Sequence, residues 1–174
     1  MKMILSRLFM PLLVVMMVSV TSCKKDGDIG PGGFVPDNMV GQWLHGNFSM
    51  TEFWGYDGSY QGNAYEQSVA FDFKGNGRYE MYFIGTANNY GCRTEALSWT
   101  KGKVDFNEEE GTFTLTPSEG RFRGYYNCAS GQNFDRKARP EELKTQVFRY
   151  EFKPDSYGKV WLFINDSSFK AVSW

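Results

Sequence analysis

Large hydrophobic and polar residues alternate along most of the chain. In residues 69–74, Phe71 and Phe73 alternate with small or polar residues, and in residues 78–84 apolar side chains again occupy every second position. This period of two is typical of strands that bury one face of a sheet. Gly75-Asn76-Gly77 lies between the two segments and supplies residues that tolerate positive φ. The pattern therefore predicts a β-hairpin.

The same alternation recurs in seven further segments at the spacing expected for hairpins. They are residues 40–50, 95–100, 103–106, 112–116, 120–127, 145–153 and 159–165. Lys101-Gly102 predicts a tight turn between two of them, and residues 107–111 predict a loop. Only residues 139–143, with Pro140 in the first turn, indicate a short helix. About eight or nine short strands predict an all-β fold, either a barrel or a sandwich.

The first 22 residues have the organisation of a secretory signal peptide. Basic residues precede an apolar run over residues 8–20 that is too short to span a membrane. The run ends in Val20-Thr21-Ser22-Cys23, which resembles the lipobox of bacterial lipoproteins. The resemblance implies that residues 1–22 are removed and that Cys23 carries a lipid anchor. The alternative is an ordinary signal peptide in which Cys23 has no special role.

Glycine and proline are dense in residues 23–37, which predicts a flexible tether behind the lipid-bearing residue. The folded domain is then expected at residues 38–174. Lys24-Lys25-Asp26 resembles the charged surface-export signal of Bacteroidetes lipoproteins. Together these features predict a protein anchored by lipid to the outer membrane, and the export signal implies exposure at the cell surface.

Charge narrows the range of partners. The chain has 19 Lys and Arg against 20 Asp and Glu, for a net charge of −1. It therefore has no basic excess to attract nucleic acid and no polybasic cluster to bind anionic headgroups. We expect contact with the membrane through the lipid anchor and no nucleic-acid partner.

Cys92 and Cys128 are the cysteines left once Cys23 is assigned to the lipid. In an oxidising envelope compartment they are expected to form a disulfide. The alternatives are two free buried thiols or a metal pair. A metal pair is disfavoured because His45 is the only histidine and neither cysteine has a CxxC partner. We therefore expect no metal site and no cofactor.

Gly41-Gln42-Trp43 resembles the Gly-x-Trp motif of lipocalins. Residues 71–79, and Leu97-Ser98-Trp99 ahead of the Lys-Gly dipeptide, follow in an order similar to lipocalin-like domains of Bacteroidetes lipoproteins. The resemblance implies an up-and-down antiparallel β-barrel of about eight strands, in which Trp43 plugs one end. It also implies that a long loop after the first strand covers the mouth, where one small ligand binds.

Residues 51–64 occupy the place of that loop and are rich in aromatic residues. Trp54, Tyr56, Tyr60 and Tyr65 offer flat amphipathic faces near Asp and Asn side chains, a combination that suits sugars or mixed apolar and polar molecules. These four are the candidate ligand-binding residues. The alternative is that they only cover the core.

A cluster of basic residues marks a second candidate site. Arg136, Lys137 and Arg139 lie in the polar stretch of residues 128–140, where they could bind an anion. We favour a solvated loop, because short charge clusters usually face water.

The sequence favours no catalytic function. His45 lacks a nucleophile in a recognisable motif, and no G-x-S-x-G sequence is present. The carboxylates on strands alternate with the apolar face and are expected to point to solvent: Asp72, Glu80, Glu95 and Asp105. Glu52 or Glu66 near the candidate mouth could face inward, but their spacing does not establish the acid and base pair that glycoside hydrolysis needs. We therefore expect that the protein is not an enzyme.

The expected function is non-catalytic binding of a small hydrophobic or amphipathic molecule by a membrane-anchored lipoprotein. The alternative is an accessory surface lipoprotein that binds glycan or a partner protein through exposed aromatic residues. The two differ in whether large side chains fill the interior completely. The side chains concerned are Met81, Phe83, Phe113, Leu115, Phe148 and Phe152.

Overall fold

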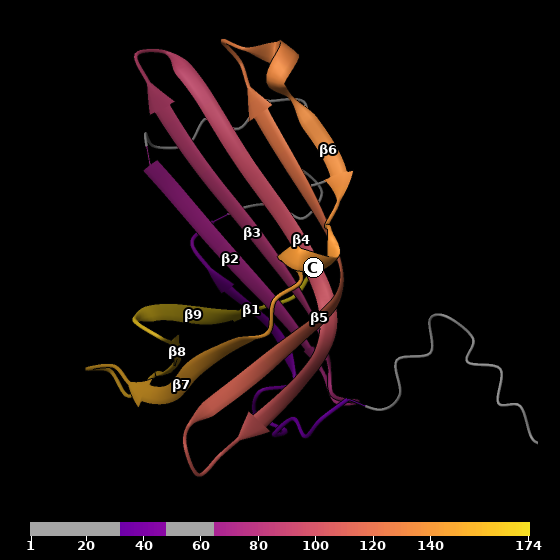
Figure 1. Cartoon of the computed structure of the whole chain (residues 1–174). Coiled ribbons are helices and arrows are strands. Elements are labelled where there is room, and N and C mark those ends of the chain that lie inside the picture. Colours follow the sequence, from indigo (N-terminus) through magenta and orange to yellow (C-terminus); the bar gives the residue numbers. More distant parts are fainter. Residues whose placement is uncertain (1–31, 48–64) are drawn as a thin grey trace, which may run out of the picture.

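A computed structural model describes residues 32–47 and 65–174 (Figure 1). These residues form strands and two short 3-10 turns, with no α-helix among them. The strands are β1 (Gly41–His45), β2 (Tyr65–Lys74), β3 (Arg78–Asn89), β4 (Cys92–Asn107), β5 (Thr112–Tyr126), β6 (Phe134–Lys137), β7 (Gln146–Pro154), β8 (Val160–Ile164) and β9 (Ser167–Val172). The 3-10 turns are η1 (Ser130–Gln132) and η2 (Pro140–Glu142). The all-β prediction is confirmed.

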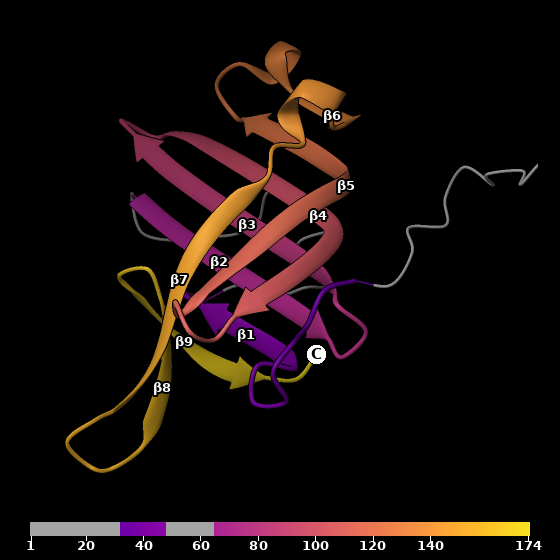
Figure 2. The ribbon, with the colours of Figure 1, turned by 60° about the horizontal axis from the view of Figure 1, so that its bottom comes forward.

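One antiparallel sheet closes on itself in a ring of eight strands (Figures 1 and 2). Strands β1 to β5 each pair with the next, β5 continues to β7, and β8 and β9 return to β1. Strand β6 lies outside the ring and pairs with the second half of β5. The arrangement is compatible with a barrel-like fold.

The turn predicted at Lys101-Gly102 is wrong, because β4 continues through both residues. Lys101 pairs with Glu119 and Gly102 with Pro117, so the β5 residue Ser118 has no partner opposite and forms a β-bulge. A Cβ atom on Gly102 would lie 2.1 Å from the carbonyl oxygen of Thr116. The glycine therefore marks a close approach of two backbones, which a sequence pattern cannot distinguish from a turn.

Two strands of the structure were not predicted from the sequence. Strand β6 has only four residues, of which three are charged, and β9 follows β8 after a single tight turn at Asn165 and Asp166. Asn165 has a φ of 52°, the left-handed conformation that permits this turn. Where the sequence indicated a short helix, Pro140–Glu142 forms a 3-10 turn.

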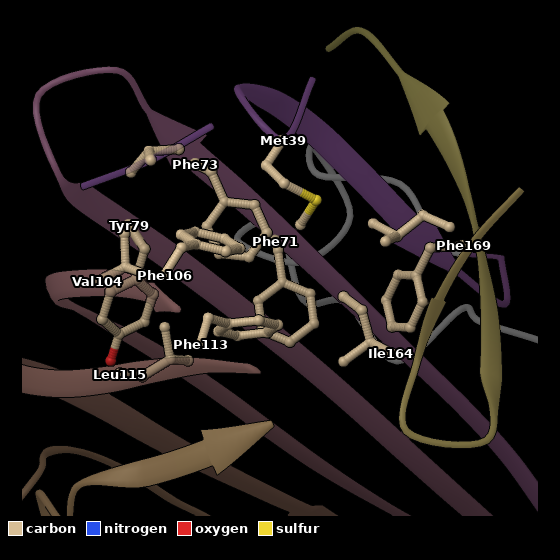
Figure 3. Packing of buried hydrophobic residues seen from close by; sticks show 12 residues of the cluster. Met39, Phe71, Phe73, Tyr79, Val104, Phe106, Phe113, Leu115, Ile164 and Phe169 are labelled. Carbon is tan, nitrogen blue, oxygen red and sulfur yellow. The ribbon is translucent and has the colours of Figure 1, made fainter. Parts of the chain in front are cut away.

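An aromatic cluster fills one end of the ring, which we call the base (Figure 3). Phe113 lies at its centre and is fully buried. Its ring stacks on Phe148 at a centroid distance of 5.1 Å and meets Phe73 and Phe106 at 5.3 Å and 5.0 Å. Burial of these rings supplies the main hydrophobic contribution to the free energy of folding.

Residues 32–39 close the base. Gly33 N–H donates to the carbonyl of Val104, and Phe34 accepts from the amide of Phe106. The side chain of Met39 is fully buried, and its carbonyl accepts the indole N–H of Trp43 at 2.9 Å. Trp43 thus packs against the core cluster at the base.

Part of the predicted tether belongs to this packed end. Residues 32–37 lie against the ring, whereas residues 23–31 and the signal segment lie outside the described residues. The glycines explain the difference: a Cβ on Gly32 would lie 1.8 Å from the carbonyl oxygen of Gly77, so glycine is needed for packing there. Dense glycine predicts flexibility, but at Gly32 it permits a close contact with Gly77 instead.

The disulfide predicted between Cys92 and Cys128 is confirmed, with the two Cα atoms 5.4 Å apart. It joins the first residue of β4 to the segment that follows β5, at the end of the sheet away from the base. We call this the far end. The backbones of Arg93 and Asn127 next to it are also hydrogen-bonded.

Replacing both cysteines with serine is expected to lower the free energy of unfolding by about 3–4 kcal/mol, because the unfolded chain regains the entropy that a loop of this length restricts. Urea unfolding followed by tryptophan fluorescence measures the change. A reducing agent is the matched control: it should destabilise the wild type by a similar amount and leave the variant unchanged. Equal stability of variant and wild type would show that the bridge contributes nothing.

Candidate functional site

The bulge at Ser118 determines which residues of β5 face the inside of the sheet. On the base side of the bulge, Phe113 and Leu115 face the core. On the far side, even-numbered instead of odd-numbered residues of β5 face inwards, because the pairing of β4 with β5 shifts by one residue at the bulge. Ser98 therefore pairs with Phe122 and Ala96 with Gly124, and these even-numbered residues of β5 continue the inner face.

Two adjacent rows of inner-face residues cross the far end of the sheet. The first row consists of Val69, Phe83, Ser98, Phe122 and Arg136. The second consists of Gln67, Gly85, Ala96, Gly124 and Phe134. Large side chains dominate the first row, and the second has small residues at its centre with Phe134 at its β6 end.

The small residues leave an open hollow of about 330 Å³. Its lining includes Phe83, Ala96, Ser98, Phe122, Phe134 and Arg136, with Glu142 at its side, together with the β4 and β5 residues Leu97 and Arg123. A Cβ on Gly124 would lie 2.4 Å from the ring of Phe134, so that ring lies directly over the glycine. The ring of Phe83 lies in the same way beside Gly85, where the nearest atom would be 3.0 Å away.

Arg136 forms the polar part of the hollow. Its guanidinium lies 5.5 Å from the ring centroid of Phe122 and 5.6 Å from that of Phe134, which are cation–π distances. Nη1 and Nη2 donate to the two carboxylate oxygens of Glu142 at 2.7 Å and 2.8 Å, and Nη1 also donates to the carbonyl of Lys137.

Glu142 is held ionised by its neighbours. The hydrogen bond from Arg136, followed by that from the backbone N–H of Arg139, lowers the pKa of Glu142 to about 2. The same contact raises the pKa of the Arg136 guanidinium. Both groups therefore stay charged over the neutral range, and the pair carries no net charge.

Strand β6, which supplies Phe134 and Arg136, is fixed from its outer face. Arg121 donates to both carboxylate oxygens of Asp135 at 2.6 Å and 2.8 Å, and Arg123 lies 3.1 Å from the same carboxylate. Asn133 accepts the backbone N–H of Tyr126 just before the strand. These contacts compensate for the small size of β6.

The structure divides the predicted basic cluster. Arg136 lines the hollow, while Lys137 follows it on the strand and is exposed. Arg139 is the N-cap residue of η2. The three residues do not form a common site. Alternation along the chain could not indicate the hollow beside Arg136, because its other lining residues Phe83, Ser98 and Phe122 come from distant strands.

The aromatic residues predicted to bind a ligand are only partly covered by the structure. Trp54, Tyr56 and Tyr60 lie outside the described residues. Tyr65 is the first residue of β2, where its backbone pairs with Ala87, and its side chain is also outside the description. The last described residue before that segment, Asn47, and the first after it, Tyr65, both lie towards the far end of β1 and β2.

The prediction that the strand carboxylates point to solvent is wrong for Asp72 and Glu95, which are 8% and 6% exposed. Both lie on the outer face as expected, but that face carries a second apolar cluster, formed by Leu44, Ala70, Tyr82, Ile84 and Leu97. Asp72 is bonded to Lys74 and Gln42, and Glu95 is paired with Arg93. Each buried charge therefore has a partner.

Glu80 occupies the same outer face. Burial acts to raise the pKa of its carboxyl, but hydrogen bonds from Tyr82 and Trp99, together with the charges of Lys74 and Lys101, lower it overall.

Among the described residues there is no group of three His, Cys, Asp or Glu that could hold a metal ion. His45 Nδ1 donates to the carbonyl of Ser168 at 2.9 Å.

Two other hollows in the described part of the chain differ in chemistry. One, of about 360 Å³, lies around Lys74, Arg78, Glu80 and Lys101. The second, of about 900 Å³, is lined mainly by polar residues of the β4–β5 and β8–β9 turns and of β7. Each has a single aromatic residue in its lining, whereas the far-end hollow has three.

The substitution Gly124→Ala is expected to displace the ring of Phe134 from the hollow, because the added Cβ would occupy the position of ring atoms. Loss of the nuclear Overhauser contacts between the Phe134 ring and residue 124 measures this displacement. Unfolding free energy should change by less than about 1 kcal/mol, since the fold itself tolerates the methyl group. Gly131→Ala is the control, because a Cβ there meets nothing within 4 Å. Unaltered Phe134 contacts in the Gly124 variant would contradict the placement of the ring.

Comparison of the chain with protein-family models, with curated proteins and with solved structures gave no match. No activity is therefore transferred from another protein. The chemistry of the far-end hollow is the basis for a functional assignment: three phenylalanine rings, small residues between them, and one guanidinium held by a carboxylate.

Proposed function

We propose that the protein binds a small hydrophobic or amphipathic molecule, without catalysis, in the hollow at the far end of the sheet. The observation that carries this proposal is the open, phenylalanine-lined hollow of about 330 Å³, within the range typical of small-molecule sites. Apolar rings provide most of the contact area, and a single charged pair provides orientation.

The distribution of large side chains supports a binding site at one end only. Six large side chains could fill the interior completely. Five of them pack in or against the base cluster: Met81, Phe113, Leu115, Phe148 and Phe152. Phe83 is absent from that cluster and lines the hollow instead. A filled base gives stability, and the open far end leaves apolar surface for a ligand.

The proposal includes the setting of the domain. We propose an up-and-down, lipocalin-like barrel on a lipoprotein that is anchored at Cys23 in the outer membrane and exposed at the cell surface. The sequential order of strands around the ring and the lipobox-like sequence support it. Among the described residues, no helix has the length and apolar character needed to cross a membrane.

The direction of the hollow follows from where the chain joins the ring. Gly32 is hydrogen-bonded at the base, nine residues after Cys23. A stretch of this length spans at most about 30 Å. The base would then face the bilayer, and the hollow at the opposite end would open away from it, towards a ligand in the aqueous phase.

The substitution Ala96→Phe tests the binding site. Ala96 is exposed in the centre of the hollow, so a phenyl ring there fills the space without entering the core. We expect it to reduce binding of the fluorescent apolar probe N-phenyl-1-naphthylamine by at least tenfold. Val147→Phe is the control, because Val147 is exposed on β7, away from the hollow. Equal probe affinity in both variants would remove the hollow as the site.

The same probe-binding measurement tests the predicted first-loop residues Trp54 and Tyr56. The double substitution Trp54→Ala and Tyr56→Ala is expected to abolish probe binding, while thermal stability stays near that of the wild type. Unchanged affinity would assign binding to the hollow alone.

The alternative function, binding of glycan or a partner protein through exposed aromatic residues, has its own support. Tyr90 at the β3–β4 turn and Tyr157 at the β7–β8 turn are almost fully exposed. Tyr157 lies at the tip of a hairpin that projects from the ring (Figure 2). Retention on a glycan array that is lost in Tyr157→Ala, together with no probe binding by the wild type, would favour this alternative.

A further inference from the structure

We infer that the hollow selects molecules with a carboxylate head group, and that the free edge of the Arg136 guanidinium is the group that binds it. This inference deepens the proposed function and rests on it. It concerns which amphipathic molecules the hollow takes, and it assigns the choice to a single side chain.

The hydrogen bonds of Arg136 leave one edge of the guanidinium unused. Arginine has five N–H donors. Both hydrogens of Nη1 are used, one by Glu142 and one by the carbonyl of Lys137, and one hydrogen of Nη2 is used by Glu142. Within residues 32–47 and 65–174, no acceptor is bonded to Nε–H or to the second hydrogen of Nη2.

The two unused donors are neighbours on the planar group. Nε–H and the outer Nη2–H point in nearly the same direction and form a fork that matches the two oxygens of a carboxylate. Glu142 occupies the opposite fork, between Nη1 and Nη2. The guanidinium can therefore bind a second carboxylate without giving up the first.

The surroundings of the guanidinium strengthen such a contact. The group lies over the rings of Phe122 and Phe134 and lines the apolar hollow. Charge-assisted hydrogen bonds are stronger where apolar surface excludes water than at an open surface. A ligand that places a polar head here and an apolar body on the rings would satisfy both parts of the site.

The row of inner-face residues indicates how the body of such a ligand would lie. Arg136, Phe122, Ser98 and Phe83 follow one another across β6, β5, β4 and β3. Three strand spacings of about 4.8 Å separate the first from the last, a span of about 14 Å. A carboxylate at Arg136 would thus allow a single medium-length alkyl chain to reach Phe83.

Charge favours a carboxylate over other heads. Because Glu142 already neutralises Arg136, a monovalent carboxylate adds one negative charge to the site, whereas a phosphate monoester adds nearly two. An ammonium head would face the positive charge of Arg136, whose free N–H groups cannot accept a hydrogen bond. An alcohol could accept only one of the two parallel hydrogen bonds.

The test compares two ligands that differ only in the head group. Dodecanoate and dodecan-1-ol displace N-phenyl-1-naphthylamine from the full-length protein, and the ratio of their affinities measures head-group selection. For the wild type we expect dodecanoate to bind at least about tenfold more tightly, since a hydrogen bond to a charged group is worth that much or more.

Three variants assign the selection to Arg136. Arg136→Gln is expected to bring the affinity ratio to about twofold or less, and Arg136→Lys to lose most of the preference, because lysine keeps the charge but not the fork. Lys137→Gln is the matched control: it removes the same charge from the adjacent residue and should retain the wild-type ratio. Urea unfolding verifies that each variant is folded.

The outcomes separate this inference from the proposed function. A wild-type ratio near one, or a ratio unchanged by both Arg136 substitutions, overturns the head-group assignment while probe binding sensitive to Ala96→Phe still supports the hollow as a site. A ratio lowered equally by Lys137→Gln would show general attraction by positive charge and also overturn it. If the wild type binds neither the probe nor either ligand, the proposed function and the inference both fail.

Discussion

The β-bulge at Ser118 is the constraint on which the rest of the structure depends. Two long strands, β4 and β5, run through the base and the far end, and the single unpaired residue changes which face of β5 points inwards between them. Phe113 faces the core on one side of the bulge, and Phe122 faces the hollow on the other. With uniform alternation, Arg121 and Arg123 would point inwards at the far end and place their charges in the apolar hollow.

The base, which carries most of the apolar burial, and the far end, where we propose the binding site, are consequently different parts of one sheet. The base buries a continuous cluster of aromatic rings and is closed by residues 32–39, so it supplies most of the apolar burial. The far end has fewer buried apolar contacts and is fixed by the disulfide at Cys92 and by ion pairs to Asp135. Such polar and covalent contacts position β6 without filling the space in front of it.

Alternation in the sequence was sufficient to predict strands, because a period of two follows from local backbone geometry. It was also sufficient to place Phe71 and Phe73 on the core face. It failed where geometry depends on partners: Gly102 permits a bulge, and Gly32 permits contact with Gly77. The hollow could not be predicted for the same reason, since it arises when the register of four strands brings together residues that are far apart in the sequence.

The ion pair of Arg136 with Glu142 explains how a half-buried arginine could contribute to recognition. A free arginine side chain loses considerable rotamer freedom when it binds a ligand, which weakens the net interaction. Here Glu142 already fixes the guanidinium, and Glu142 is itself held by the backbone N–H of Arg139 in η2. Because the pKa of Glu142 is lowered from 4.5 to about 2, the stabilising contribution of the pair is lost progressively as the pH falls from about 4.5 to about 2. Over the neutral range the free edge of Arg136 therefore stays charged and oriented, and any pH dependence of head-group binding would arise from the ligand.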